Sequence, residues 1–232
     1  MRREFEPMLQ HMQGVTVVAI LLFGTIQYAG AQQNSQQLLS DGYRRYNVEF
    51  CTITYNLTGM FKGTETITFD RYGLREAKQT RTEFTSGSIS VKTNTLTIMD
   101  GEITYSINLD DKTGTKMSNA IISSLGKAGE RDLVKIGDEM MRQMGAKKTG
   151  TEVVAGKTCD RWEIAQMKSV SCVWNSIPLK TEVGLTGVKS GNIASKVDDK
   201  TKPGDSTFRI PEEIKIQDKG ALPIKKPRPK TN

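Results

Sequence analysis

Cysteine and histidine are the residues of this chain whose types and spacing bear most directly on chemistry. The 232 residues include three cysteines, Cys51, Cys159 and Cys172, and a single histidine, His11. None of the cysteines has the CxxC spacing of a zinc ribbon or a thioredoxin-like redox centre. His11 lies in a segment that we expect to be removed on export, so the mature chain would lack imidazole as a general base or zinc ligand. The sequence therefore predicts no catalytic residue, no metal site and no cofactor.

An enzyme built from this chain would have to rely on its carboxylates. A pair of acids can hydrolyse a glycosidic bond without histidine, but no sequence pattern brings two Asp or Glu residues together for that purpose. Asp110-Asp111 and Asp198-Asp199 could bind a hard cation, although adjacent acids at a turn are usually only solvated. We therefore expect a protein without enzymatic activity.

Cys159 and Cys172 occupy two neighbouring β-rich segments that also contain both tryptophans. The connection Ala165–Ser169 suits a short turn, so we predict a hairpin closed by a disulfide between these cysteines. If they lie opposite each other, Ala165–Gln166 forms a two-residue connection. On the chain-entropy model such a bond would stabilise the fold by roughly 3 kcal/mol. Spacing alone does not show that the sulfurs meet, and three single-bridge pairings are open.

Cys51 would then be the unpaired cysteine. It lies in the strand-like run Tyr46–Leu57, where a buried thiol that acts as a small apolar side chain is the favoured interpretation. The alternative is a reactive or intermolecular thiol.

The N-terminus has the layout of a secretory signal peptide. Basic residues precede the apolar run Val15–Ile26, and the small residues Ala29–Ala31 are followed by a polar stretch. This order predicts cleavage after Ala31 and export, with the periplasm as the destination. Two acidic residues in the basic region suggest that translation begins at Met8 or Met12. The alternative is an uncleaved membrane anchor.

The charge distribution argues against nucleic-acid binding. The net charge is +7, and four positive charges lie in the Pro-rich stretch Ile224–Asn232. The rest of the chain is only mildly basic and displays no patch suited to nucleic acid. The basic tail could contact anionic lipid headgroups, but a solvated, disordered tail is the favoured interpretation.

Runs rich in Thr, Ile, Val, Tyr and Phe predict a β-meander on both sides of a helical segment. The alternation of Ile103, Tyr105, Ile107 and Leu109 with polar residues indicates a strand with one apolar face. Pro178 should break the ladder locally. The expected strands are 46–57, 64–71, 74–84, 88–99, 103–109, 150–155, 158–164, 169–175, 179–184 and 192–197.

Between the two groups of strands, the pattern predicts helices. Residues 116–125 suit a short helix and 130–144 a longer one that ends at Gly145. Leu133, Ile136, Met140 and Met144 form its apolar stripe. This stripe either packs into a core or, because methionine adapts to irregular apolar partners, lines a site for lipid chains.

These elements give a domain organisation. We expect a signal peptide over residues 1–31 and a loose or helical lead-in over 32–44. A single domain follows over 45–212, with a helical insert at about 116–145. Residues 213–232 are expected to be a basic, Pro-rich, disordered tail.

The order of segments resembles a known family. A meander and a helical segment precede GTEVVAGKTCDRWEI, SVSCVWNSIPLKTEV and a final strand ending in FRIP. Over about residues 43–212 this pattern resembles exported bacterial proteins of the outer-membrane lipoprotein carrier superfamily (LolA-like and LolB-like). The resemblance implies an α+β fold, in which a strongly curved antiparallel sheet, an incomplete barrel, holds helices in its concave face. In the carriers the space between sheet and helices receives acyl chains. No ligand residue of a carrier matches a position here.

The sequence thus favours a monomeric, non-enzymatic protein that binds a lipid, acyl chain, lipoprotein or other apolar ligand beneath a helical lid. The alternative is an envelope interaction or stress-sensing protein that uses the same fold to dock a protein partner. In either case each lining candidate could instead be a core residue. The candidates are Ile67, Phe69, Tyr105, Ile107, Leu133, Ile136, Met140, Met144 and Trp174.

Overall fold

The structure, a computed structural model, describes residues 34–118, 131–185 and 188–221. All of these belong to one compact unit, Gly30–Leu222. The predicted signal peptide and the end of the predicted tail, 222–232, lie outside the described residues, as does most of the helix expected at 116–125. No helix in the described part of the chain is long and apolar enough to cross a membrane.

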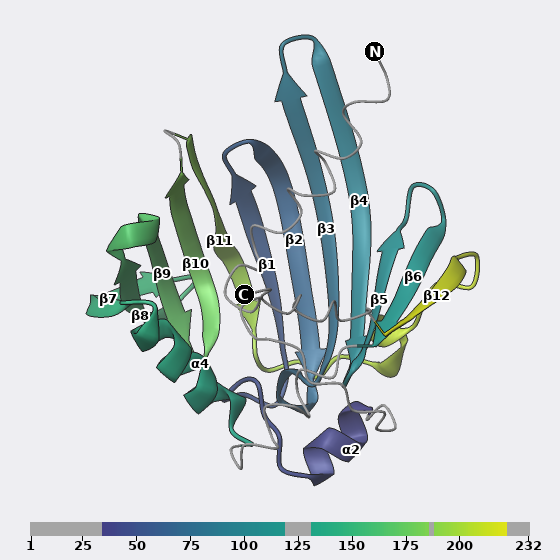
Figure 1. Cartoon of the computed structure of the whole chain (residues 1–232), viewed down its shortest axis with the longest axis horizontal. Helices are drawn as coiled ribbons and strands as arrows, with labels where there is room; N and C mark the ends of the chain where they lie inside the picture. The colour runs from purple at the N-terminus through teal and green to yellow at the C-terminus, as the bar shows by residue number, and fades with distance from the viewer. Residues whose placement is uncertain (1–33, 119–130, 186–187, 222–232) are drawn as a thin grey trace, which may run out of the picture. The chain divides into compact units, whose positions relative to one another are not determined.

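Twelve strands form one open sheet (Figure 1). They are β1 (Cys51–Thr58), β2 (Phe61–Asp70), β3 (Arg75–Ser86), β4 (Ile89–Asp100), β5 (Ile103–Asn108), β6 (Thr113–Ser118), β7 (Lys147–Val154), β8 (Lys157–Ile164), β9 (Ser169–Trp174), β10 (Ile177–Leu185), β11 (Val188–Asp198) and β12 (Lys215–Ala221).

Two meanders, β1 to β6 and β7 to β11, join where β1 pairs with β11. The order across the sheet is β12-β6-β5-β4-β3-β2-β1-β11-β10-β9-β8-β7. Every pairing is antiparallel except that of β12 with β6, which is parallel. The curved, open antiparallel sheet with few helices confirms the fold class predicted from the sequence.

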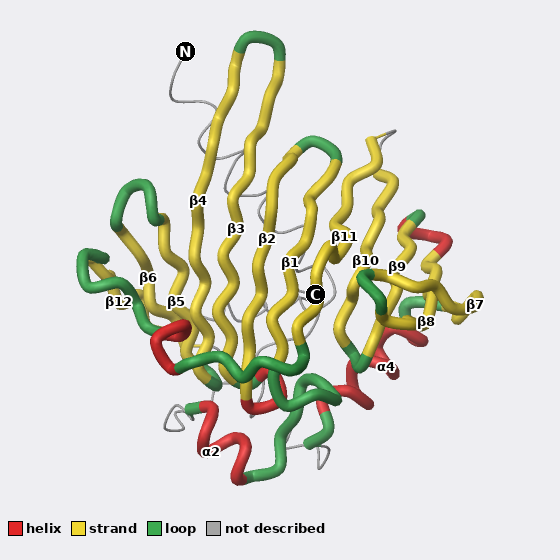
Figure 2. Tube along the Cα trace, turned by 180° about the vertical axis from the view of Figure 1, so that it is seen from behind, coloured by secondary structure: helices red, strands yellow, loops and turns green. Residues whose placement is uncertain are grey.

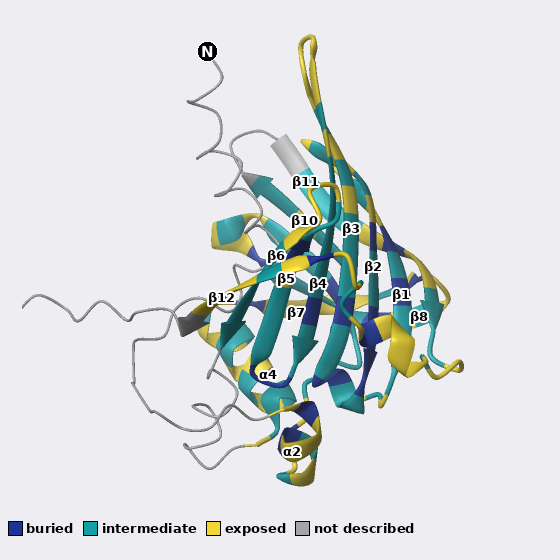
Figure 3. Ribbon diagram, turned by 90° about the vertical axis from the view of Figure 1, so that its right-hand side faces the viewer, coloured by how far each residue is buried: buried dark blue, intermediate teal, exposed yellow. Residues whose placement is uncertain are grey.

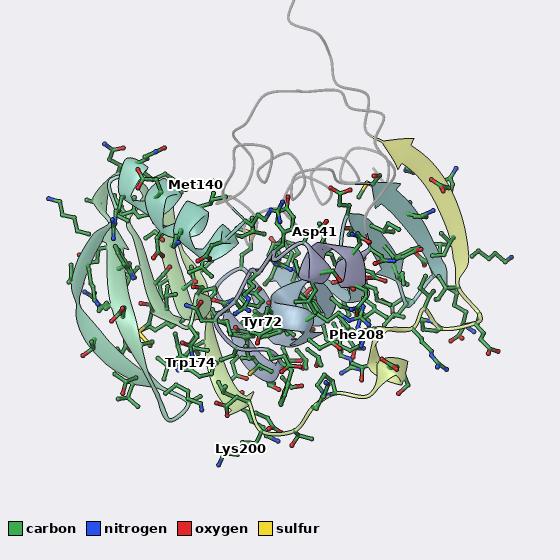
Figure 4. All side chains as sticks on the ribbon, turned by 90° about the horizontal axis from the view of Figure 1, so that it is seen from below. Asp41, Tyr72, Met140, Trp174, Lys200 and Phe208 are labelled. Carbon is green, nitrogen blue, oxygen red and sulfur yellow. A yellow bond between two sulfur atoms is a disulfide. The ribbon has the colours of Figure 1, made fainter. Side chains whose placement is uncertain are left out.

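The sheet is concave on one side and convex on the other (Figure 4). Side chains alternate between the faces along each strand, and the register fixes which residues share a face. Cys51 lies opposite Phe69 and Ile53 opposite Ile67, so these four side chains lie on the same face. They belong to the main buried cluster with Trp174 packed against it, and this cluster occupies the concave side.

We call this cluster the apolar floor. Its buried members come from both meanders, so it joins them across the β1–β11 pairing. They are Cys51, Ile53, Tyr55, Phe69, Val154, Cys159, Cys172, Ile177, Leu179 and Ala194.

Residues 199–214 cross the convex face and lead to β12 (Figure 2); we call this segment the strap. Ile214 of the strap forms a buried cluster with Ile98 and Ile107 of the sheet. The strap includes the 3-10 turn η3 (Asp205–Phe208). It covers apolar side chains that would otherwise face water.

Arg75 clamps the strap to the sheet. Its guanidinium donates two hydrogen bonds to the Asp70 carboxylate and one, of 2.8 Å, to Asp205 Oδ1. It also lies 4.2 Å from the ring centroid of Phe208. Hydrogen bonding and charge from Arg75 lower the pKa of Asp205. The clamp therefore combines charge, planar geometry and ring stacking at one guanidinium.

Three irregularities interrupt the ladder near the concave core. The register shifts where β11 has the extra residue Ser195 opposite Thr54 and Tyr55, where β7 has Thr149, and where β10 has Leu179 after Pro178. Extra residues of this kind bend a strand and increase its twist. The break at Pro178 confirms the prediction that this proline interrupts pairing locally.

Two helices are described. The short α2 (Ser35–Ser40) begins with Asn34 as its N-cap and packs Leu38 against Tyr43 and Leu74. The longer α4 (Leu133–Gln143) begins with Asp132, whose side chain accepts a hydrogen bond from the Val134 amide. Helix α4 lies on the concave side of the sheet (Figure 4), whereas α2 lies beyond the ends of the central strands, beside the β2–β3 connection (Figure 1).

The structure differs from the sequence-based expectations in four element assignments. Residues 46–50, expected to begin the first strand, precede β1, and the expected final strand ending in FRIP is part of the strap around η3. Residues 116–118, expected to begin a helix, belong to strand β6, which pairs with β5. Residues 215–221, expected to lie in a disordered tail after residue 212, form β12 beside β6. Residues 116–118 pair with the adjacent strand β5, and residues 215–221 pair with β6, which is distant in sequence. In both cases strand pairing outweighs the structure that the local sequence pattern predicts.

A disulfide joins Cys159 and Cys172, the pair favoured from the sequence, with a Cα–Cα distance of 5.4 Å. The expected register was wrong. Cys172 lies opposite Arg161 instead of Cys159, so the bond runs diagonally between β8 and β9. The connection is the 3-10 turn η2 (Ala165–Met167) followed by Lys168 in the left-handed conformation. This longer turn displaces the pairing by two residues.

Cys51 is fully buried and not disulfide-bonded. Burial raises the pKa of its thiol to about 12. The thiol is therefore protonated and inaccessible at neutral pH, which supports the structural interpretation over the reactive one.

This arrangement predicts a specific thiol count. Native protein should react negligibly with Ellman's reagent, non-reducing denaturant should expose one thiol per chain, and prior reduction should expose all three. Cys51→Ala should give none in non-reducing denaturant. Three thiols without reductant would contradict the disulfide.

The clamp predicts that Arg75→Lys destabilises the fold by roughly 2–3 kcal/mol, because lysine cannot replace the paired hydrogen bonds and the ring contact. Since the pKa of Asp205 is lowered in the folded protein, its contribution is present above the unfolded value and is lost as the pH falls below about 4. Urea unfolding against pH measures both effects. The exposed pair Lys202–Glu49 offers a control, since Lys202→Met should change stability by less than about 0.5 kcal/mol. Equal effects of the two variants would rule out the clamp.

Candidate functional site

The concave face is the candidate functional site, and the register divides it into two halves. Over β1, β2 and β7 to β11 it carries the apolar floor. Over β3 to β6 it carries mainly Thr, Ser, Asn and Lys side chains. We call this part the polar half, although Phe84, Val91, Met99 and Met117 also lie on it; its polar residues include Lys78, Thr80, Thr82, Thr93, Thr95, Thr97, Thr104, Ser106, Asn108, Thr113 and Thr115.

Tyr55 lies at the centre of the floor. It is 1% exposed, and its hydroxyl donates a 3.1 Å hydrogen bond to the Pro178 carbonyl oxygen at the bulge of β10. This bond links the two meanders at the point where the ladder of β10 is interrupted. The ring of Tyr55 thus contributes to the apolar floor, and its hydroxyl connects the two meanders through a hydrogen bond.

A hydrogen-bonded group closes the floor at the ends of β2 and β3. Tyr46 packs on Phe69 with ring centroids 4.6 Å apart, and its hydroxyl donates a 3.2 Å hydrogen bond to Glu76 Oε2. Arg45 forms a 3.4 Å ion pair with the same oxygen. Burial raises the pKa of Tyr46, so this hydroxyl remains a donor at neutral pH.

Trp174 lies at the opposite side of the floor. The Lys157 ammonium lies 4.8 Å from its ring centroid and 2.6 Å from Asp199 Oδ2. Lys157 thereby lowers the pKa of Asp199. The indole is held between the apolar cluster and a cation, which makes it a fluorescent reporter for the floor.

The polar half contains a hydroxyl contact and an open depression. Thr82 and Thr93 lie opposite each other, with 2.7 Å between their Oγ1 atoms. Nearer the β12 edge, Asn108, Thr115 and Gln217 line a depression together with their neighbours. These side chains offer hydrogen bonds and little apolar surface.

Helix α4 is held at its two ends. At the first, the Leu133 amide donates a 3.0 Å hydrogen bond to the Arg44 carbonyl oxygen, and Arg131 donates one of 2.6 Å to the Asp41 carbonyl oxygen. At the other, Gly145 and the buried Ala146 lead into β7. No residue of the helix itself is buried. The apolar stripe of α4 is therefore only half covered.

Two buried side-chain oxygens in the described part of the chain have no hydrogen-bond partner, Glu65 Oε1 and Asn192 Oδ1. Glu65 lies opposite Tyr55 and Thr80, and Asn192 lies opposite Leu57. Both therefore lie on the concave face. The site combines an apolar floor with acceptors that the protein leaves unused.

The structure brings together only part of the predicted lining set. Ile67, Phe69 and Trp174 lie in or against the apolar floor. Tyr105 and Ile107 lie on the convex face, where they pack with Ile98 beneath the strap. Those two residues are covered by the strap and are not part of a concave lining.

The four predicted residues of the helical stripe are half-buried in α4 and just after it. Leu133 packs against the small cluster around Leu38 and Leu74 instead of against the floor. Ile136, Met140 and Met144 belong to the half-covered stripe. Figure 4 shows Met140 on the concave side of the sheet.

Sequence reasoning missed Tyr55, Glu65 and the threonine-lined half of the face. The signal for Glu65 was available. Every second side chain of a strand lies on the same face, so Gly63, Glu65, Ile67 and Phe69 share one face of β2. The carboxylate of Glu65 therefore lies on the face that also carries the apolar residues Ile67 and Phe69.

The architecture defines a class of protein, the open, strongly curved antiparallel sheet with a helix on its concave side, which is the arrangement that the LolA-like and LolB-like resemblance implied. No protein-family model matches the chain, and no curated protein sequence matches it significantly.

Among solved structures, the chain is similar to an uncharacterized conserved protein from Thermus thermophilus, with 7% identity over 80% of this chain and 99% of the other, at a TM-score of 0.47. It is also similar to MucB (12% identity, 77% of this chain and 62% of MucB, TM-score 0.41) and to LprF from Mycobacterium bovis (10%, 69% and 91%, TM-score 0.32). At these values the three structures show no more than a similar course of the chain.

The site predicts the effect of adding one methyl group to the floor strand. A Cβ at Gly63 would collide with the Arg81 carbonyl of β3, so Gly63→Ala should destabilise the protein by about 1–3 kcal/mol. Gly137 of α4 has open space around it, so Gly137→Ala should be neutral or stabilising by up to about 1 kcal/mol. Urea unfolding compares the two, and equal effects would contradict the close strand approach at Gly63.

Proposed function

We propose that this is an exported, non-enzymatic binding protein that holds a lipid, acyl chain or lipidated protein between the concave face and α4. The observation that carries the proposal is the half-covered apolar stripe of α4 on the same side of the sheet as the apolar floor. An amphipathic helix buries its stripe against a partner in a stable fold. An apolar ligand between floor and helix would complete that burial.

Export is supported by the disulfide, because such bonds persist in oxidising compartments such as the periplasm. It is also supported by the signal-peptide layout of the N-terminus. The resemblance to the lipoprotein carriers supports the ligand class. The half-buried methionines of the α4 stripe suit it as well, since their unbranched side chains adapt to chains of different shape.

Helix α4 would act as a lid. It is attached at its ends by hydrogen bonds to the segment before β1 and by a glycine-containing turn before β7, where Gly145 has a φ of 79°. Rotation at these ends would move the stripe toward or away from the floor without breaking the sheet. The lid would exclude water from the ligand once it closes.

A second candidate function uses a different surface. The β3–β4 hairpin extends beyond its neighbours (Figure 1), and its end is exposed (Figure 3). Ile89 there is 54% exposed, and Met60 in the adjacent hairpin is 40% exposed. This surface would suit docking to another envelope protein, the role of a sensing or interaction module.

The lid model predicts that Met140→Glu weakens binding of a lysophospholipid at least tenfold, because a carboxylate in the stripe would have to be desolvated against the acyl chain. Arg142→Gln is the matched control, since it changes the net charge equally on the exposed face of α4. Tryptophan fluorescence titration measures the affinity.

Organic extraction and native mass spectrometry of the purified protein test the ligand class directly. A co-purifying amphiphile released by Met140→Glu but not by Arg142→Gln is the expected result. A protein that neither co-purifies with an amphiphile nor binds one in titration would refute the proposal. Crosslinking to a protein through the Ile89 hairpin would then favour the docking role.

A further inference from the structure

The Glu65 carboxylate is the buried acidic group that the concave face leaves half satisfied. Glu65 is only 3% exposed. Oε2 accepts a 3.0 Å hydrogen bond from Thr80 Oγ1, whereas Oε1 has no partner in the part of the chain that the structure describes. A buried carboxylate oxygen without a donor is costly. A ligand that supplied the donor would recover that cost on binding.

The neighbours of Glu65 cannot readily supply this donor. Tyr55, directly opposite on β1, already donates its hydroxyl hydrogen to the Pro178 carbonyl. Thr80, opposite on β3, donates its own to Oε2. Gly63, two residues before on the same face, has no side chain. A donor for Oε1 would therefore have to come from outside these three residues.

Lys78 provides the second half of the site. It lies on the same face of β3, opposite Ile67 and diagonal to Glu65. Its side chain is half-buried. No hydrogen bond or ion pair within the described segments engages its ammonium, and it lies beyond ion-pair distance of Glu65. Diagonal positions on neighbouring strands are roughly 7–8 Å apart, so a carboxylate and an ammonium face the site side by side without pairing.

We propose, building on the proposed function, that Glu65 and Lys78 select the polar end of the amphiphile, which is a zwitterionic headgroup of the phosphoethanolamine type. Its primary ammonium donates a hydrogen bond to Glu65 Oε1, and its phosphate pairs with Lys78. The acyl chain lies over the apolar floor beneath α4. The two opposite charges of the protein thereby meet the two opposite charges of the headgroup.

The chemistry discriminates among headgroups. A hydroxyl could donate to Glu65 but would leave the buried charge unneutralised, whereas an ammonium donor forms a charge-assisted bond. A choline head carries the same charge but has no N–H to donate. A glycerol head has no cation at all. Phosphoethanolamine is therefore expected to bind most tightly of the three.

The test titrates the full chain with lysophosphatidylethanolamine, lysophosphatidylcholine and lysophosphatidylglycerol of one acyl chain, each below its micelle concentration. Trp174 fluorescence or calorimetry reports binding. The ethanolamine lipid should bind at least tenfold more tightly than the other two. Glu65→Gln should abolish this preference and leave choline-lipid binding within about threefold. Lys78→Met should weaken the ethanolamine and choline lipids alike.

Two substitutions serve as matched controls. Glu83→Gln changes an exposed carboxylate on the opposite face of β3, and Lys62→Met removes an exposed ammonium on the opposite face of β2. Neither should alter affinity or selectivity. Urea unfolding of all four variants checks that each remains folded.

The outcomes separate the two proposals. Equal binding of the three lipids by the unaltered chain would overturn the headgroup assignment and leave lipid binding in place. Binding of none would overturn both. A preference for the ethanolamine lipid that survives Glu65→Gln would also overturn the assignment. The same holds if Glu65→Gln and Lys78→Met lower stability equally and neither changes the selectivity among the lipids. The comparison on the unaltered chain is decisive even if a variant fails to fold.

Discussion

An open sheet must cover two faces with one chain, and the fold depends on how this constraint is met. Side chains alternate across the twelve strands, so apolar residues fall on both sides. On the convex side the strap covers Ile98 and Ile107. Arg75 holds the strap by joining Asp70, Asp205 and the Phe208 ring at one guanidinium. The strap thus covers the apolar residues of the convex face, beside which polar side chains such as Thr52, Thr54 and Thr201 line a depression.

The concave face is itself asymmetric, and the covalent and backbone features explain why. The bulges in β7, β10 and β11 and the diagonal disulfide lie at the β7–β11 end, where they support tight curvature and bring residues from several strands into the floor. From β2 to β6 the antiparallel pairings have no register shift, and many inward side chains of β3 to β6 carry hydroxyls. One half can thus bury an apolar chain while the other half forms hydrogen bonds with something polar. Such a division suits an amphiphile better than a purely apolar ligand.

Much of this fold could be predicted from the sequence, because β-branched and aromatic runs mark most strands and Pro178 marks a break in the ladder. The limits have physical causes. An alternating strand such as Ile103–Asn108 shows that one face is apolar but not whether that face is concave or convex, so Tyr105 and Ile107 were assigned to the wrong side. The parallel pairing of β12 with β6 joins segments about a hundred residues apart, and no local pattern encodes it. Hairpin register depends on the turn, and η2 is longer than the two-residue connection that was assumed.

Glu65 shows what a departure from pattern can mean. Its strand places Gly63, Glu65, Ile67 and Phe69 on one face. Glu65 is the acidic residue on a face that otherwise carries glycine and apolar side chains in this strand, near the centre of the sheet. An exposed carboxylate one residue earlier or later would be accommodated by solvent at little cost, whereas this one is buried with a single hydroxyl donor. An apolar residue of similar size could pack there without burying an oxygen that lacks a hydrogen-bond donor. The proposed headgroup site would account for the position, since a cationic donor on the concave face would offset the free energy lost by burying Glu65 Oε1 without a partner.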